Sequence, residues 1–112
     1  MFITNRKRSM EIHCQETECG ILYSIKGALS GTQKSTISVF EKLSAAIDKG
    51  TKGIVIDLKM TTFVDSMSIG LLVGVLLKAK EKNIPLRFQN IPEHIGRVFE
   101  STQLKKIFPE LY

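Results

Sequence analysis

The sequence is poor in cysteine and proline and has no tryptophan. Among 112 residues it holds two cysteines, three prolines and no tryptophan. Cys14 and Cys19 are five positions apart, so they lack the Cys-x-x-Cys spacing of a zinc knuckle or a redox motif. We therefore expect reduced thiols, although the geometry of a hairpin would also allow a disulfide between the two.

Long hydrophobic runs are missing as well. The longest apolar run, residues 69–77, has nine residues, whereas a membrane-spanning helix needs roughly 20. The first residues lack the apolar region that follows the positive charges of a signal peptide. We expect a cytoplasmic protein without membrane insertion.

The overall composition is that of an ordinary globular domain. Hydrophobic residues make up 43% and charged residues 24% of the chain, and 112 residues fit one domain with a real core. The net charge is +5, but Arg6, Lys7 and Arg8 lie in the first nine residues, which hold no acid. We expect residues 1–9 to form a flexible basic tail and residues 10–112 to form the domain. Three charges are few for nucleic acid, so we expect no direct nucleic-acid binding.

The first half of the chain alternates between strand and helix patterns. Apolar residues at every second position predict strands at 10–15 and 21–26, joined by a polar turn that ends in Gly20. A loop at 27–32 leads to a helix that Thr32 or Ser35 could cap and that Gly50 would follow. Its apolar face is expected to comprise Ile37, Phe40, Leu43, Ala46 and Ile47.

The second half opens on a β-branched run at 53–58, which is typical of a central strand buried on both faces. A helix follows from about 67 to 82, apolar almost all round at first and rich in lysine at its end. Gly70 and Gly74 in this helix are expected to permit close packing of a neighbour.

A third unit of a strand followed by a helix completes the pattern. It consists of a strand at 85–90, a helix that Pro92 opens, and a short terminal helix at 104–108. The resulting order, ββαβαβα, predicts an α/β single domain with a mixed, mostly parallel sheet, an N-terminal hairpin and helices packed on the sheet.

The segment Asp65-Ser66-Met67-Ser68, between a strand and an apolar helix, is the best candidate site. Open α/β sheets bind ligands beyond the carboxyl ends of their strands, and free N–H groups gather at a helix N-terminus. A phosphate on Ser66 would suit that helix end but would repel a partner docked there. The plainer interpretation is a helix cap formed by Asp65 and Ser66. Ser68 is a second candidate for phosphorylation, or a first-turn residue without a role.

Several segments resemble the STAS domain, which bacterial anti-sigma factor antagonists share with the tails of sulphate transporters. They are residues 55–58 (Val-Ile-Asp-Leu), 63–66 (Phe-Val-Asp-Ser) and 69–72 (Ile-Gly-Leu-Leu). The resemblance extends over most of the chain, from about residue 10 to residue 112. It implies a SpoIIAA-like fold.

The resemblance also implies a function. In the family, the serine directly after the aspartate is phosphorylated, and this serine corresponds to Ser66. The unphosphorylated protein binds an anti-sigma factor, usually a serine kinase of the GHKL type, and so frees a sigma factor for transcription. The kinase phosphorylates the antagonist and releases it, and a PP2C-type phosphatase resets it. The expected partner-binding residues are Ser30, Thr32, Asp65, Ser66, Met67 and Ser68.

Three features depart from the family pattern. Met67 and Ser68 stand where the family has a small residue and then glycine. Ser30 replaces an aspartate, and Gln103 replaces a glycine. Ser68 loses the close backbone approach that glycine allows, and Met67 adds an adaptable apolar contact that would alter partner choice.

Two other functional classes fit the sequence less well. An enzyme is not expected, because Ser66 lacks the Gly-x-Ser-x-Gly elbow and no pattern connects His13 or His94 to it. The sequence also lacks a cluster of metal ligands and a P-loop, so no cofactor is expected. The alternative function is that of a STAS scaffold or transporter-accessory module that binds its partner without phosphorylation.

Overall fold

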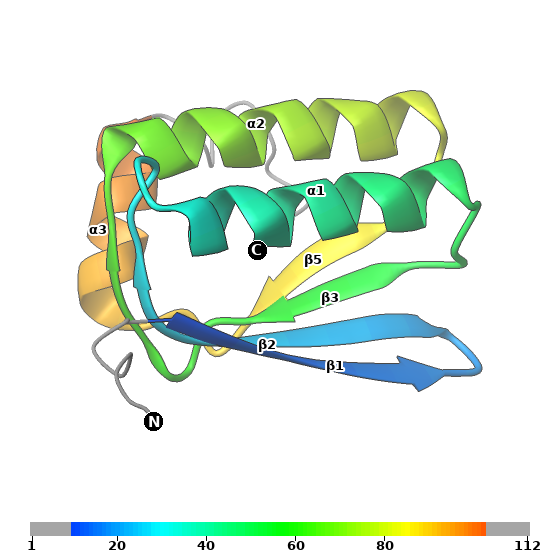
Figure 1. The fold of residues 1–112 in the computed structure, drawn as a ribbon, viewed down its shortest axis with the longest axis horizontal. Coiled ribbons are helices and arrows are strands. Elements are labelled where there is room, and N and C mark those ends of the chain that lie inside the picture. The colour runs from blue at the N-terminus through cyan, green and yellow to red at the C-terminus, as the bar shows by residue number, and fades with distance from the viewer. Residues whose placement is uncertain (1–9, 103–112) are drawn as a thin grey trace.

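The computed structural model describes residues 10–102, which form an open sheet with helices against it (Figure 1). The elements in chain order are β1 (Met10–Thr17), β2 (Gly20–Leu29), α1 (Lys34–Asp48), β3 (Ile54–Asp57), β4 (Thr61–Val64), α2 (Ser66–Glu81), β5 (Leu86–Gln89) and α3 (Glu93–Ser101). The short helix expected at 104–108, and Gln103, lie outside the described residues.

The sheet is mixed and mostly parallel, as predicted. Its order is β1-β2-β3-β5, and β4 pairs with the end of β2. β1 and β2 form an antiparallel hairpin that closes with Thr17 opposite Gly20, whereas the pairs β2–β3, β2–β4 and β3–β5 are parallel. Helices α1 and α2 lie side by side over one face of the sheet, and α3 lies near β4 (Figure 1). The predicted fold class is confirmed.

One strand was missing from the predicted order. The predicted order has no element between the strand at 53–58 and the helix that begins at about 67, but Thr61–Val64 forms β4. β4 is only four residues long, and it pairs with residues 27–29, with a register shift between Gly27 and Ala28. Residues 27–29, expected in a loop, are therefore the last residues of β2. A strand this short depends on its neighbour, so its own sequence gives little signal.

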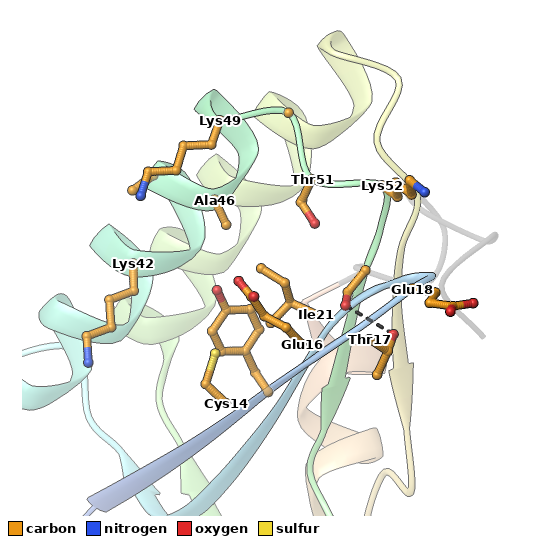
Figure 2. A pocket seen from close by; sticks show the side chains of 14 residues that line it. Cys14, Glu16, Thr17, Glu18, Ile21, Lys42, Ala46, Lys49, Thr51 and Lys52 are labelled. Carbon is orange, nitrogen blue, oxygen red and sulfur yellow. Dashed lines mark hydrogen bonds between the residues drawn. The ribbon is translucent and has the colours of Figure 1, made fainter.

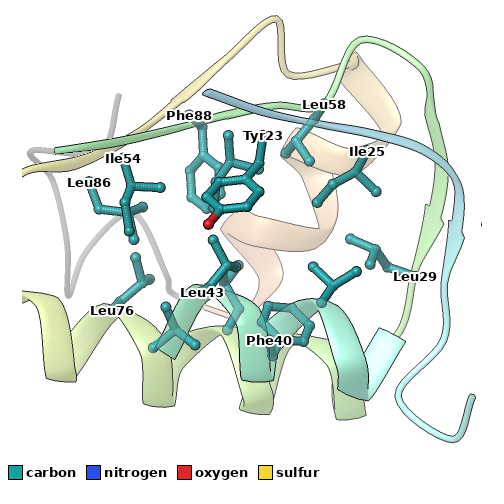
Figure 3. Close-up of a cluster of buried hydrophobic side chains, with 14 of the residues drawn as sticks. Tyr23, Ile25, Leu29, Phe40, Leu43, Ile54, Leu58, Leu76, Leu86 and Phe88 are labelled. Atoms are coloured by element: carbon teal, nitrogen blue, oxygen red, sulfur yellow. The ribbon is translucent and has the colours of Figure 1, made fainter. Parts of the chain in front are cut away.

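The core lies between the sheet and the pair α1 and α2 (Figure 3). Leu43, Ile56 and Phe99 are at most 1% exposed. The rings of Phe88 and Phe99 have centroids 5.2 Å apart, which joins β5 to α3. Burial of each large apolar side chain stabilises the fold by about 1.5–3 kcal/mol, so this cluster fixes how the helices sit on the sheet.

Some predicted details of the helices are corrected. Ile37 is 39% exposed, because Thr36 and Val39 take the core positions at the start of α1. The N-cap of α1 is Gln33, without a side-chain cap bond, so neither Thr32 nor Ser35 caps this helix. Gly50 does follow the helix, with a φ of 81° that favours glycine.

Two further expectations concern small residues. Cys14 and Cys19 are both unpaired and exposed, so the hairpin disulfide is not formed. A Cβ added at Gly70 or Gly74 would meet nothing within 4 Å. Both glycines lie on the exposed side of α2, where none of residues 10–102 packs closely against them, so the described part of the chain does not bear this prediction out. No helix within residues 10–102 is long and apolar enough to cross a membrane.

Candidate functional site

The candidate site forms where β2 and β4 end. The two strands are parallel, and their last residues, Leu29 and Val64, are paired. The loop before α1 and the first turn of α2 therefore leave the sheet at the same edge, although they are more than 30 residues apart in sequence. This is the edge at which open α/β sheets place their sites.

Asp65 connects the two segments. Its Oδ1 and Oδ2 accept the backbone N–H of Gly31 at 3.1 and 3.2 Å, and its Oδ1 accepts the N–H of Ser68 at 2.8 Å. Partial burial would raise the pKa of Asp65, but the hydrogen bonds from the Ser68 and Gly31 backbones and from the Ser30 side chain outweigh it and hold this pKa below its usual value. The ionised carboxylate therefore fastens the loop to the start of α2.

Ser68 completes a capping box with Asp65. The Ser68 hydroxyl accepts the Asp65 N–H at 3.0 Å and donates to the Asp65 carbonyl at 2.8 Å. The Ser68 residue is 2% exposed. Ser68 thus stabilises the beginning of α2, which corrects the interpretation of a first-turn residue without a role.

The close backbone approach at this edge is made by Gly31. A Cβ on Gly31 would lie 2.4 Å from the Met67 Cβ and 2.8 Å from the Ser68 nitrogen. Gly31 was not among the residues predicted for the site. The turn Ser30-Gly31-Thr32 before a helix is the feature of the sequence that points to Gly31. The sequence alone does not show that Gly31 lies against the start of α2.

Ser66 is the first residue of α2, and it is exposed. Within the part of the chain that the structure describes, its side chain makes no hydrogen bond, whereas Asp65 provides the cap. The cap interpretation therefore holds for Asp65 and not for Ser66. Met67, the next residue, is 58% exposed. A free hydroxyl and an apolar side chain stand together at the positive end of the helix dipole.

Ser30 and Thr32 form the other side of the site. Their hydroxyl oxygens are 3.1 Å apart, and Thr32 is exposed while Ser30 is half-buried. The structure thus brings the six predicted residues to one edge of the sheet. They are Ser30, Thr32, Asp65, Ser66, Met67 and Ser68.

The described residues offer little to support hydrolysis or metal chemistry here. His13 lies 3.6 Å from Glu11, and His94 Nε2 lies 2.9 Å from the Thr62 carbonyl oxygen, so neither imidazole is bonded to Ser66. In residues 10–102 no three histidine, cysteine or acidic side chains gather as a metal site would require. The arrangement suits Ser66 as an acceptor of a modifying group.

Comparison with known proteins gives a family match over most of the chain. The family model for the STAS domain matches residues 10–112. Among curated proteins, anti-sigma-B factor antagonists of several Staphylococcus aureus strains are 33% identical over 67 residues. That match covers 60% of this chain and 62% of the relative, so it spans less than two thirds of either.

Solved structures with the same fold include several antagonists. An anti-sigma factor antagonist from Mycobacterium paratuberculosis has a TM-score of 0.73 at 17% identity, covering 95% of this chain and 88% of that one. The antagonist SpoIIAA in its unphosphorylated form gives 0.73 at 18% identity, with coverages of 86% and 84%. Bacillus SpoIIAA in the phosphorylated form gives 0.68 at 19% identity, covering 86% of each chain. At these identities the likeness shows the SpoIIAA-like fold alone.

Proposed function

This chain belongs to the STAS domain family, and from that premise we propose that it is an anti-sigma factor antagonist that regulates transcription by partner switching. Its unphosphorylated form binds an anti-sigma factor that is also a serine kinase of the GHKL type. Phosphorylation of Ser66 releases the kinase, and a PP2C-type phosphatase restores the binding form. We place this cycle in the bacterial cytoplasm.

The observation that carries the proposal is the exposed Ser66 hydroxyl at the first position of α2. A phosphate there adds roughly −1.5 to −2 charges beside free backbone N–H groups and the positive end of the helix dipole. The fold therefore tolerates the modification. A partner docked on the same edge meets new charge and bulk, so the switch needs no rearrangement of the antagonist.

The proposal assigns the phosphate to Ser66 rather than to Ser68. The Ser68 hydroxyl is buried and both donates to and accepts from the Asp65 backbone. A kinase could reach it only after the first turn of α2 had opened, at the cost of the capping box.

The partner surface is formed by the residues around Ser66. Met67 supplies an exposed apolar contact, and Ser30 and Thr32 supply hydroxyls on the adjacent loop. Asp65 contributes indirectly. Its hydrogen bonds with Gly31 and Ser68 hold the loop before α1 against the first turn of α2.

Phosphorylation and binding by the kinase encoded nearest to this protein test the proposal. After incubation with ATP, mass spectrometry should locate phosphate on Ser66. In calorimetry, Ser66→Ala should bind constitutively, and Ser66→Asp should lose about 3–4 kcal/mol, which is several hundredfold in affinity. Ser38→Asp, on the exposed side of α1, is the matched control. Phosphate on Ser68 alone, or unchanged binding by Ser66→Asp, would contradict the proposal.

The second candidate function is a scaffold or transporter-accessory module that binds without phosphorylation. The observation that favours it is Met67, whose exposed side chain stands directly beside Ser66 and would be buried in a constitutive interface. Stable binding without any phosphate transfer would support this candidate.

A further inference from the structure

A groove lies at the other end of the sheet from Ser66, between the β1–β2 hairpin and the second half of α1 (Figure 2). Its volume is about 600 Å³, within the range of binding pockets in general. β2 begins at this groove with Gly20 and ends at Leu29, next to the candidate site, so one strand separates the two places.

One side of the groove is an edge strand. β1 is eight residues long and pairs with β2 alone among the strands of residues 10–102. Its register runs without interruption from Met10 opposite Gly27 to Thr17 opposite Gly20. The strand contains no lysine, no proline and no bulge, and of the devices that keep an edge from pairing with another chain it has only the charges of Glu11 and Glu16.

The floor of the groove is apolar. Cys14 pairs with Tyr23 and Glu16 pairs with Ile21, so the groove-facing row of β1 continues onto β2. Tyr23 is 3% exposed, and Ala46 of α1 is 8% exposed. The buried residues at the bottom of the groove are therefore apolar, whereas Cys14 and Glu16 of β1 are exposed at its outer edge.

The rim on the helix side is basic. Lys42 and Lys49 line the groove from α1, two turns apart, which is roughly 10.5 Å along the axis. Figure 2 shows both side chains extending from the same side of the helix. Within the described residues neither they nor Lys52 form an ion pair, whereas Lys78 pairs with Asp48 at 2.8 Å. Unpaired lysines beside an open edge favour an acidic occupant.

We propose that this groove binds an extended acidic peptide segment, which adds to the free edge of β1 as a further strand and places carboxylates under Lys42 and Lys49. Backbone hydrogen bonds to β1 supply affinity and the lysines supply selectivity, as in other cases of strand addition. Glu16, in the groove-facing row, and Glu18, which also lines the groove, oppose the acidic segment and weaken its binding, so the lining keeps an excess of one positive charge from Lys42, Lys49 and Lys52. A second copy of this chain, paired edge to edge through β1, is the other possible occupant, and it would be recognised by a dependence on protein concentration.

The test uses a labelled peptide of eight residues that alternates glutamate with valine, and a matched peptide with lysine in place of glutamate. With nitrogen-15-labelled protein, the acidic peptide should shift the amide signals of β1 and of residues 42–52 and leave Ser66 unchanged. The lysine peptide should bind at least tenfold more weakly. Equal binding of both peptides, no binding, or shifts confined to the start of α2 would overturn the proposal.

Charge variants complete the test. Lys42→Glu with Lys49→Glu should weaken the acidic peptide at least tenfold, whereas Lys34→Glu, exposed on the same helix but outside the groove, should not. Glu16→Gln should tighten binding. Amide signals of β1 that change with protein concentration alone would identify a second copy as the occupant and would also overturn the proposal. Because none of these residues contacts Ser66, failure here leaves the partner-switching proposal intact.

Discussion

The Asp65 carboxylate holds the backbone of Gly31. Both of its oxygens accept the Gly31 N–H, at 3.1 and 3.2 Å, across 34 positions of sequence. The same carboxylate caps α2 through the Ser68 N–H. The loop before α1 and the first turn of α2 are therefore held together as one unit. The backbone position of Ser66, the first residue of α2, is fixed by these hydrogen bonds.

Gly31→Ala is expected to disrupt this unit. The new Cβ would stand 2.4 Å from the Met67 Cβ and 2.8 Å from the Ser68 nitrogen, and a helix backbone cannot move aside cheaply. We expect a loss of about 1–3 kcal/mol in the free energy of unfolding, typical of overpacking, measured by urea denaturation.

Gly74→Ala is the matched control for Gly31→Ala. Its Cβ would meet nothing within 4 Å on the open side of α2. Alanine has the higher helix propensity, so this variant should be more stable by up to about 1 kcal/mol. Equal stability of the two variants would show that the contact between Gly31 and α2 is not tight.

Replacement of each of the two serines at the start of α2 should change the stability of the protein by a different amount. Ser68→Ala removes both hydroxyl bonds of the capping box and leaves the Asp65 N–H without its partner, so we expect a loss of about 1–2 kcal/mol of stability. Ser66→Ala removes an exposed hydroxyl and should stay within about 0.5 kcal/mol of the parent protein. Thermal unfolding of both variants checks this, and the reverse ranking would contradict the assignment of roles.

Asp65 should contribute to acid sensitivity. Its pKa in the folded protein lies below 3.8, its ordinary value, because hydrogen bonds from Ser68 and Gly31 outweigh the effect of partial burial. The stability from this group is therefore fully present above about pH 4 and is lost as the pH falls through the folded pKa. Asp65→Asn keeps a capping oxygen but should lack this part of the pH dependence. A carboxyl titration midpoint of 3.8 or higher, by carbon NMR, would refute the prediction.

Tyr23 should make the stability of the protein fall at alkaline pH. Burial first, and then the neighbouring Cys14 and Glu16, raise the pKa of Tyr23 to about 12 from 10.0. The unfolded chain releases this proton at lower pH than the folded chain, so stability is complete below pH 10 and falls between about pH 10 and 12. Two pKa units correspond to at most about 2.7 kcal/mol. Tyr23→Phe should lack this decline, and the late phenolate absorbance phase of the parent protein should vanish with it.

The sequence by itself determined the fold class and the identity of the candidate site. Hydrophobic periodicity is a local property, so alternation marked β1 and β2, and the apolar run marked the buried half of α2. The dipeptide Asp65-Ser66 before that helix indicated the candidate site, because a helix start has its own chemical signature.

Only the tertiary structure decided which hydroxyl is free and what lies beside it. Ser66 and Ser68 are alike in sequence, but the helix turns one outward and the other into the capping box. β4, the contact of Gly31 with α2 and the groove beside β1 each depend on segments far apart in the chain. Long-range pairing of this kind leaves little trace in local sequence, since the partner's backbone, and not the residue's own side chain, sets the geometry.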